Sequence, residues 1–126
     1  MVRGQEVAGK QVNVNGPRFG PGDYFLFKER LTNSAGTRVG TDNIICTVHF
    51  PFVQNRFGIL CEGTFTFSGR GGIERGTISV EGVLVYRAGV HSFALAVTGG
   101  TGHYQNVRGE VHVPAEGNSL TFHLIP

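Results

Sequence analysis

The sequence predicts an all-β fold, an eight-stranded antiparallel closed β-barrel with a central apolar cavity. Apolar runs of strand length, alternating with period two, follow one another at short intervals from Asp23 onward, as consecutive antiparallel strands do. Turns rich in Gly, Pro, Asn and Ser separate these runs. The chain of 126 residues contains 20 glycines, which interrupt helices, and shows no helical apolar stripe. Such a succession predicts a barrel or sandwich, and a closed barrel of eight strands can hold one small ligand.

The predicted elements divide the chain into an N-terminal arm, residues 1–22, and a barrel domain, residues 23–126. The arm is polar, ends in the loop-forming sequence Gly16-Pro-Arg-Phe-Gly-Pro-Gly22, and can include a short strand over residues 7–14. The strands predicted for the barrel cover residues 24–31, 37–50, 57–67, 73–86, 91–98, 104–113 and 119–125.

The last predicted strand illustrates the alternation. Leu120, Phe122 and Leu124 share one face, while Thr121 and His123 share the other. The runs 44–50 and 57–67 alternate in the same way. One face of each strand is therefore expected to pack inside and the other to be more polar.

The composition narrows the classes of function. Hydrophobic residues make up 40% of the chain and charged residues 16%, so disorder is not expected. The net charge is +2 and no run of Lys and Arg forms a basic stripe, which argues against nucleic-acid binding. No apolar stretch is long enough for a membrane-spanning helix, and the first residues lack the apolar run of a secretory signal. We expect a cytoplasmic protein, or a secreted one if a signal has been trimmed.

The chain has two cysteines, Cys46 and Cys61. A hairpin centred on Val53 and Gln54 would place them opposite each other, where a disulfide can form. Two buried thiols packing as small apolar residues are the alternative, and both remain open. No Cys-x-x-Cys and no tight His pair is present, so a zinc site is not expected.

The glycine-rich stretch from Phe93 to Gly109 looks at first like a nucleotide loop. A dinucleotide fingerprint starting at Gly100 and Gly102 would need a third glycine where the chain has Gln105. A phosphate loop would need Gly-Lys-Ser/Thr, which is also missing. The residues that follow have strand composition, so we expect these glycines to form a tight turn or bulge between two strands.

Three blocks resemble the superfamily of dirigent proteins and allene oxide cyclases. Ala96-Val-Thr-Gly-Gly-Thr-Gly-His-Tyr-Gln-Asn-Val-Arg-Gly-Glu110 resembles the dirigent block Val-Gly-Gly-Thr-Gly-x-Phe/Tyr-x-x-Ala-Arg-Gly and the Ile-Thr-Gly-Gly-Ser-Gly block of the cyclases. Gly76-Thr-Ile-Ser-Val-Glu-Gly82 is similar to the dirigent Ser-Thr-Leu-Ser-Val-x-Gly block. Phe25-Leu-Phe-Lys-Glu-Arg-Leu31 is similar to an early dirigent strand with an acid after aromatic residues. The resemblance runs from Asp23 to the C-terminus.

The resemblance implies an eight-stranded barrel, usually trimeric, whose apolar cavity holds a reactive small molecule made by another catalyst. It implies a cyclase-like or isomerase-like function: binding a reactive intermediate of specialised metabolism (a polyketide, polyene, epoxide or quinone methide) and controlling its cyclisation and stereochemistry. The alternative is a non-catalytic dirigent-type scaffold or carrier that steers radical coupling. The proline of the cyclases has no match near Ser34-Ala35, which argues against allene oxide cyclase activity itself.

Three residues are the catalytic candidates. Arg108 matches the arginine of the dirigent block, where it would stabilise an oxyanion or orient an acid; a surface arginine is the alternative. Glu29 matches the early dirigent acid and shares a face with Phe25 and Phe27, so burial would raise its pKa and make it a general acid; a solvated glutamate is the alternative. Glu62 lies on a polar strand face and would be a cavity acid or a solvent-facing residue.

Further residues are candidates for substrate binding. Tyr86 and Tyr104 would line a pocket and donate hydrogen bonds, and His103 would lie at the cavity rim. Cys46 falls in a segment similar to a pocket-lining block of the cyclases. Phe27 and Phe65 are the remaining candidates for substrate binding.

We expect neither metal nor cofactor, since the His-x-His pattern of cupin barrels is absent. The expected partners are a hydrophobic small-molecule intermediate and further copies of the chain, in a trimer or dimer.

Overall fold

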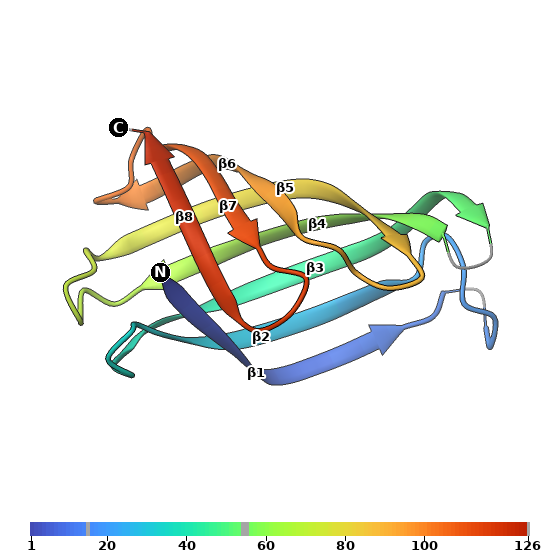
Figure 1. Cartoon of the computed structure of the whole chain (residues 1–126), viewed down its shortest axis with the longest axis horizontal. Coiled ribbons are helices and arrows are strands. Elements are labelled where there is room, and N and C mark those ends of the chain that lie inside the picture. The colour runs from blue at the N-terminus through green and yellow to red at the C-terminus, as the bar shows by residue number, and fades with distance from the viewer. Residues whose placement is uncertain (15, 54–55, 126) are drawn as a thin grey trace.

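The computed structural model describes residues 1–14, 16–53 and 56–125, which form one closed antiparallel β-barrel. Its eight strands pair in sequence order (Figure 1). They are β1 (Val2–Val12), β2 (Tyr24–Thr32), β3 (Arg38–Val53), β4 (Arg56–Phe67), β5 (Gly76–Arg87), β6 (Phe93–Gly102), β7 (Arg108–Val113) and β8 (Ser119–Ile125). The predicted fold class is confirmed. Within the described residues, no helix is long and apolar enough to cross a membrane.

The segment predicted as an arm contains the strand that closes the barrel. β1 pairs with β2 from Arg3↔Thr32 to Val12↔Tyr24, with a register shift between Glu6 and Ala8. It pairs with β8 only through Val2↔Leu120 and Arg3↔Ser119. Beyond this short seam β1 bends and continues along β2 while β8 runs away from it (Figure 1). The strand starts earlier than the short one expected over residues 7–14, because Val2 and Gly4 are buried and pack against the barrel interior.

The other expected strands are present, and several of their boundaries are displaced; β5, for example, begins at Gly76 where residue 73 was expected. β6 continues through the glycines to Gly102, and a register shift opposite Ser79 and Val80 marks a bulge there. A Cβ at Gly100 would collide with the carbonyl oxygens of Tyr104 and Thr77, which explains the glycine. The expected strand start at residue 104 is wrong: the turn comes after the glycines, with the Tyr104 N–H donating to the Thr101 carbonyl at 3.1 Å, and β7 begins at Arg108.

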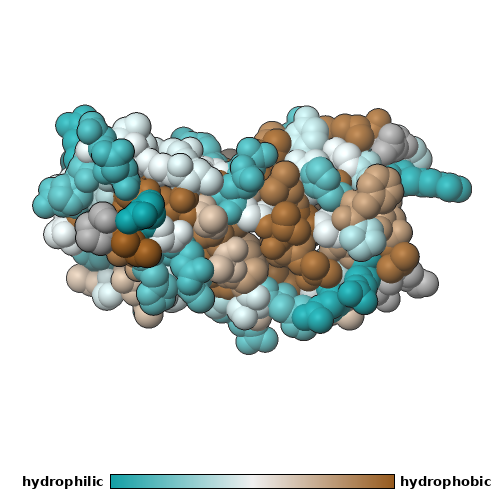
Figure 2. Space-filling model, turned by 90° about the horizontal axis from the view of Figure 1, so that it is seen from above, coloured by the Kyte–Doolittle hydropathy of each residue, from teal (hydrophilic) through white to brown (hydrophobic). Residues whose placement is uncertain are grey.

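One end of the barrel interior is filled by side chains. Phe65, Leu31 and Val111 are essentially inaccessible to solvent. The Phe65 ring meets Phe122 edge-on with centroids 5.1 Å apart. Seen from above, a group of apolar residues lies near the middle of the molecule, and further apolar residues lie among hydrophilic ones toward both ends (Figure 2). The barrel is therefore packed solid at one end and more open toward the other.

A disulfide joins the two cysteines. Cys46 on β3 and Cys61 on β4 are direct cross-strand partners, and their sulfur atoms are bonded. Of the two alternatives left open by the sequence, the structure shows the bridge. Gln54, at the centre of the expected hairpin, lies outside the described residues; β3 ends at Val53 and β4 begins at Arg56.

Candidate functional site

A chamber of about 710 Å³ occupies the open end of the barrel. Every second residue along β2 to β5 points inward, and those at this end of the barrel contribute to its wall. The cross-strand pairs Phe25↔Cys46, Cys46↔Cys61 and Phe57↔Tyr86 all belong to this inward face. No Lys, Arg, Asp or Glu lies among the described residues that line it. The lining residues are Gln11, Phe19, Phe25, Phe27, Cys46, Phe52, Val53, Phe57, Ile59, Cys61, Leu84, Tyr86, Val90 and Phe93.

Aromatic rings dominate the chamber wall. Phe57 and Tyr86 stack with centroids 4.7 Å apart and an interplanar angle of 15°. Phe19 is in contact with three other rings, at 6.1 Å from Phe25, 6.0 Å from Phe52 and 5.4 Å from Phe57. Flat aromatic faces at these spacings form an apolar surface suited to a planar or polycyclic guest.

The loop between β1 and β2 holds Phe19 at the chamber. Asp23 is fully buried, and its two carboxylate oxygens accept hydrogen bonds from the backbone N–H groups of Val14 at 2.8 Å and Gly20 at 2.9 Å. The backbone carbonyl of Asp23 also accepts from the Val48 N–H at 2.8 Å, which anchors the loop to β3. Sequence reasoning missed both Asp23 and Phe19, although the Gly/Pro-rich loop that carries them was recognised.

A pair of carboxyl groups lies at the junction between the chamber and the packed end. Glu29 on β2 and Asp42 on β3 are direct cross-strand partners, two residues beyond the pair Phe27↔Ile44, of which Phe27 lines the chamber. Two residues along a strand correspond to about 7 Å. Asp42 has no exposed surface, and its Oδ1 accepts the Glu29 N–H at 3.2 Å.

The Asp42 carboxyl has a strongly raised pKa. Burial raises its pKa to about 8, and the adjacent Glu29 carboxyl adds to the rise through a shared side-chain hydrogen bond and like-charge repulsion. Its Oδ2 meets no donor among the described residues. A proton on Asp42 would make this buried oxygen a donor, and the Glu29 carboxyl beside it offers acceptor oxygens.

The neighbouring strand, β1, leaves room for the Glu29 side chain of this carboxyl pair. Glu6 on β1 is the cross-strand partner of Glu29 and is exposed to solvent. A Cβ at Gly4 would come within 2.8 Å of the Glu29 Oε2, so this glycine leaves room for the carboxyl group. Within the described residues, no group of three or more His, Cys, Asp or Glu side chains is placed to hold a metal ion.

The structure brings four of the sequence-predicted residues to this region. Phe27, Cys46 and Tyr86 line the chamber, and Glu29 belongs to the carboxyl pair. Phe65 points inward as well, but it is packed in the filled end as the cross-strand partner of Asp42 and does not line the chamber.

Of the alternatives left open for Arg108 and Glu62, the structure shows the surface position for both, and neither side chain faces the cavity. Arg108 is exposed on the outer face of β7, because Val111 and Val113 on the other face pack inward. Glu62 is likewise exposed on the outer face of β4, between the inward-facing Cys61 and the glycine that follows.

Tyr104 and His103 lie at the other end of β6 from the chamber. Tyr104 is buried, and its hydroxyl donates to the Glu74 carbonyl at 2.9 Å. Burial, with the Glu74 charge, raises the Tyr104 pKa. His103 is exposed and meets the Tyr104 ring edge-on. Both residues therefore serve the turn after β6 and lie outside the chamber wall.

Asp42 is the central residue that sequence reasoning missed. A signal was available: the alternation places Asp42 on the same strand face as Ile44 and Cys46, an apolar face of the kind that packs inward. An acid on an apolar inward face is a candidate functional group.

Comparison with known proteins shows relatives in structure. No family model matches the sequence, and no curated protein matches it. A solved structure of a pyocyanin demethylase has a TM-score of 0.80 and 22% identity, over 98% of this chain and 97% of its own length. The Diels-Alderase AbmU from Streptomyces koyangensis has a TM-score of 0.66 and 18% identity, over 98% of this chain and 62% of its own. The pterocarpan synthase dirigent protein GePTS1 has a TM-score of 0.63 and 18% identity, over 94% of this chain and 75% of its own. The chain therefore has the closed β-barrel fold of a dirigent protein and a Diels-Alderase, as its three sequence blocks implied.

Proposed function

We propose that this protein binds an apolar, ring-containing small molecule in the aromatic chamber and promotes its isomerisation or cyclisation with the Glu29–Asp42 pair. The observation that carries the proposal is the location of two adjacent carboxyl groups, of which Asp42 is fully buried, next to an apolar chamber. The substrate class follows from the wall, which offers aromatic faces and no charge among its described residues.

The chamber suits a reactive guest. An unstable polyene, epoxide or quinone methide needs a fixed conformation and protection from water more than strong chemistry. Phe19, Phe57 and Tyr86 pack against one another as a continuous aromatic wall, against which a planar molecule can lie in one conformation. A polar group on that molecule, pointing past Phe27, would then lie toward the carboxyl pair.

The carboxyl pair can supply the proton transfers. The raised pKa of Asp42 suits it to give a proton to a carbonyl, epoxide or methide oxygen, while the Glu29 carboxyl beside it is the candidate to accept a proton from carbon. The names of the similar structures agree with this class of substrate, since they describe a Diels-Alder cyclisation, the synthesis of a pterocarpan and the demethylation of pyocyanin.

A binding assay tests the chamber. N-phenyl-1-naphthylamine, a neutral aromatic dye, should gain fluorescence with the protein. Tyr86→Arg, which places a charge in the chamber, should weaken dye binding at least about tenfold. The matched control is Val85→Arg, because the adjacent Val85 is exposed on the outer face of the same strand. Equal loss in both variants, or dye binding unaffected by either, would contradict a ligand chamber.

A reaction assay tests the carboxyl pair. The protein is incubated with pyocyanin and with a panel of polyenes, epoxides and quinone methides, and products are followed by chiral chromatography with mass detection. Glu29→Gln and Asp42→Asn should each lower the rate by about 10²-fold or more while dye binding stays the same. Unchanged rates would remove the pair from the mechanism.

A dirigent-type scaffold or carrier is the second candidate. It is favoured by one observation, that the carboxyl pair adjoins the chamber without forming part of its described wall. In that case the two carboxyl variants change the ratio of stereoisomers or the affinity and leave the total rate of product formation unaltered.

A further inference from the structure

A small hollow of about 240 Å³ lies beside the chamber, where β5 ends. Leu84 and Phe93 line both this hollow and the chamber, so the two spaces adjoin. We call the hollow the arginine site, after two of its four polar lining residues, which are Arg56, Arg87, His91 and Ser92.

The arginine site lies where β5 and β6 are no longer paired. Cross-strand pairing between them ends at Glu81↔Ala96, whereas β5 runs on to Arg87 and β6 begins at Phe93. The end of β5 remains paired with β4, up to Arg56↔Arg87. The hollow therefore borders the chamber on one side and the outer surface, where both arginines are exposed, on the other.

The positive charge of the arginine site has no matching acid. Arg56 and Arg87 are direct cross-strand partners, and like charges in that position destabilise a sheet. No Asp or Glu is among the described residues that line the site. Neither arginine forms an ion pair with a described residue; the ion pair seen there, His112 with Glu110, lies on β7. An anion between the two guanidinium groups would relieve their repulsion.

The loop after β5 adds further polar groups. The His91 Nε2–H donates to the Arg87 carbonyl oxygen at 3.1 Å, which ties the loop to the end of the strand. Ser92 is exposed in the same hollow, and its hydroxyl can donate a hydrogen bond. A guanidinium group presents paired N–H donors that match the oxygens of a carboxylate or phosphate. The arginine site therefore suits one small oxyanion.

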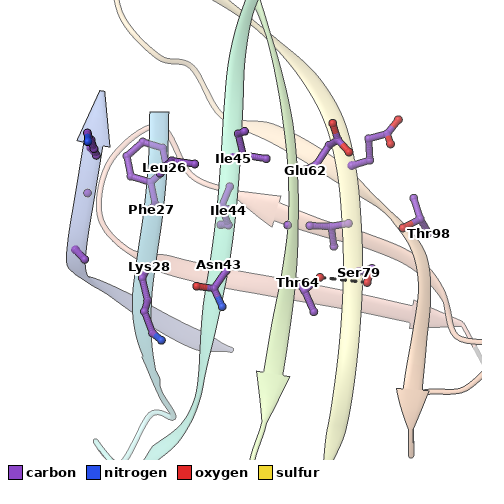
Figure 3. Close-up of a pocket in the computed structure, with 16 residues that line it drawn as sticks. Leu26, Phe27, Lys28, Asn43, Ile44, Ile45, Glu62, Thr64, Ser79 and Thr98 are labelled. Carbon is purple, nitrogen blue, oxygen red and sulfur yellow. Dashed lines mark hydrogen bonds between the residues drawn. The ribbon is translucent and has the colours of Figure 1, made fainter. Parts of the chain in front are cut away.

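The wide hollow on the outer face of β1 to β5, of about 750 Å³, differs in its charge (Figure 3). Lys28 and Glu62 both lie in it, and Lys10 and Glu81 also line it. An anion bound there would meet two carboxylates as well as two ammonium groups, so the hollow gives an anion little net attraction. Its two lysines are therefore suitable controls for the two arginines.

We propose that the arginine site binds an anionic group of the guest, an inference that rests on the proposed binding of an apolar body in the chamber. The natural ligand is then an amphiphile. Its ring or polyene body lies against the uncharged chamber wall, and its carboxylate, or a similar small oxyanion, lies between Arg56 and Arg87. Anchoring one end in this way fixes the orientation of the guest in the chamber.

A matched pair of dyes tests the site. 8-Anilino-1-naphthalenesulfonate is N-phenyl-1-naphthylamine with one sulfonate group added, so the two probes differ only in the anion. In Arg56→Gln with Arg87→Gln, the affinity for the sulfonate dye should fall at least about fivefold, while that for the neutral dye changes less than about twofold. Fluorescence titration measures both affinities. Added salt should weaken sulfonate binding to the wild-type protein more than to the double variant.

The control variant is Lys10→Gln with Lys28→Gln. It removes the same two positive charges from the outer hollow and should leave both affinities within about twofold of the wild-type values. All four substituted residues are exposed, so both double variants should fold, and urea unfolding checks this.

Displacement of the sulfonate dye identifies the preferred oxyanion. 1-Naphthoate carries a carboxylate, 1-naphthyl phosphate carries a phosphate, and 1-naphthol carries neither. Both anions should displace the dye from the wild-type protein at lower concentration than 1-naphthol, and this advantage should disappear in the arginine double variant. Equal displacement by all three compounds would contradict an anion site.

Two further results would overturn the arginine site: equal loss of sulfonate binding in the arginine and lysine variants, or a sulfonate affinity that neither variant alters. In both cases, retained binding of the neutral dye leaves the proposed chamber standing. A wild-type protein that binds neither dye would instead overturn the chamber, and the anion site with it.

Discussion

Glu29 and Asp42 face each other across β2 and β3, and the Glu29 N–H donates to the Asp42 Oδ1 at 3.2 Å inside the barrel. The Asp42 side chain has no exposed surface, and the pKa of its carboxyl is raised to about 8 by burial first and by Glu29 second. This relationship places an acid with a raised pKa where the packed end of the barrel meets the aromatic chamber.

The raised pKa makes stability depend on pH. In the unfolded chain the Asp42 carboxyl has its ordinary pKa of 3.8, so between about pH 4 and pH 8 the folded protein keeps a proton that the unfolded chain has released. The contribution of Asp42 to the free energy of unfolding is therefore fully present below pH 4. It is lost as the pH rises toward 8, by up to about 1.4 kcal/mol for each pH unit. Urea unfolding between pH 5 and 8 measures this slope.

Asp42→Asn is the matched variant for that measurement. The amide keeps the shape and does not titrate, so the slope should flatten. A wild-type stability that rises steadily from pH 5 to 8, with the same slope in Asp42→Asn, would show that Asp42 ionises normally.

Gly4 controls the position of the Glu29 carboxyl. In Gly4→Ala the new Cβ would lie 2.8 Å from the Glu29 Oε2, so the glutamate side chain must move away from its present position. We expect catalysis to fall and the pH profile of the rate to shift, with stability lowered by less than about 1.5 kcal/mol. Gly99→Ala is the control, because a Cβ there meets no heavy atom within 4 Å. Equal rates in the two variants would argue against positioning by Gly4.

The disulfide stabilises the chamber wall. It closes a loop with a sequence separation of 15 between Cys46 and Cys61, for which chain entropy gives about 3 kcal/mol. Thermal unfolding with and without dithiothreitol should show a large loss on reduction, and a Cys46→Ser/Cys61→Ser variant should be insensitive to the reagent. An unfolding midpoint that dithiothreitol leaves in place would contradict this.

Asp23 stabilises the loop that carries Phe19. Asp23→Ala leaves the N–H groups of Val14 and Gly20 without their acceptor, which costs about 1–3 kcal/mol for each unpaired buried group. We expect faster proteolysis within residues 13–22 and weaker dye binding, because Phe19 loses its fixed position over the chamber. Limited proteolysis with mass detection measures the first effect. If the loop stays protected and dye affinity is unchanged, Phe19 is held by its ring contacts alone.

The period-two pattern shows which residues share a strand face, but not which face points inward. For Phe27, Glu29, Cys46 and Tyr86 the aromatic and apolar neighbours on the same face also indicated the correct side. For Arg108, the valines on the opposite face of the strand indicated that the arginine points outward. In the sequence interpretation, the resemblance to the dirigent block was given more weight than these valines. The outcome shows that burial of apolar area decides the side of a barrel strand.

The sequence by itself determined the all-β class, the spacing of the strands from Asp23 onward, the glycine bulge of β6 and the pairing that brings Cys46 opposite Cys61, because these depend on local pattern and on neighbours joined by short turns. Only the tertiary structure decided that β1 closes the barrel, that Phe19 reaches the chamber and that Asp42 is sealed against Glu29. These features depend on strand register and on which space inside the barrel the large side chains leave unfilled, and both are properties of the closed sheet as a whole.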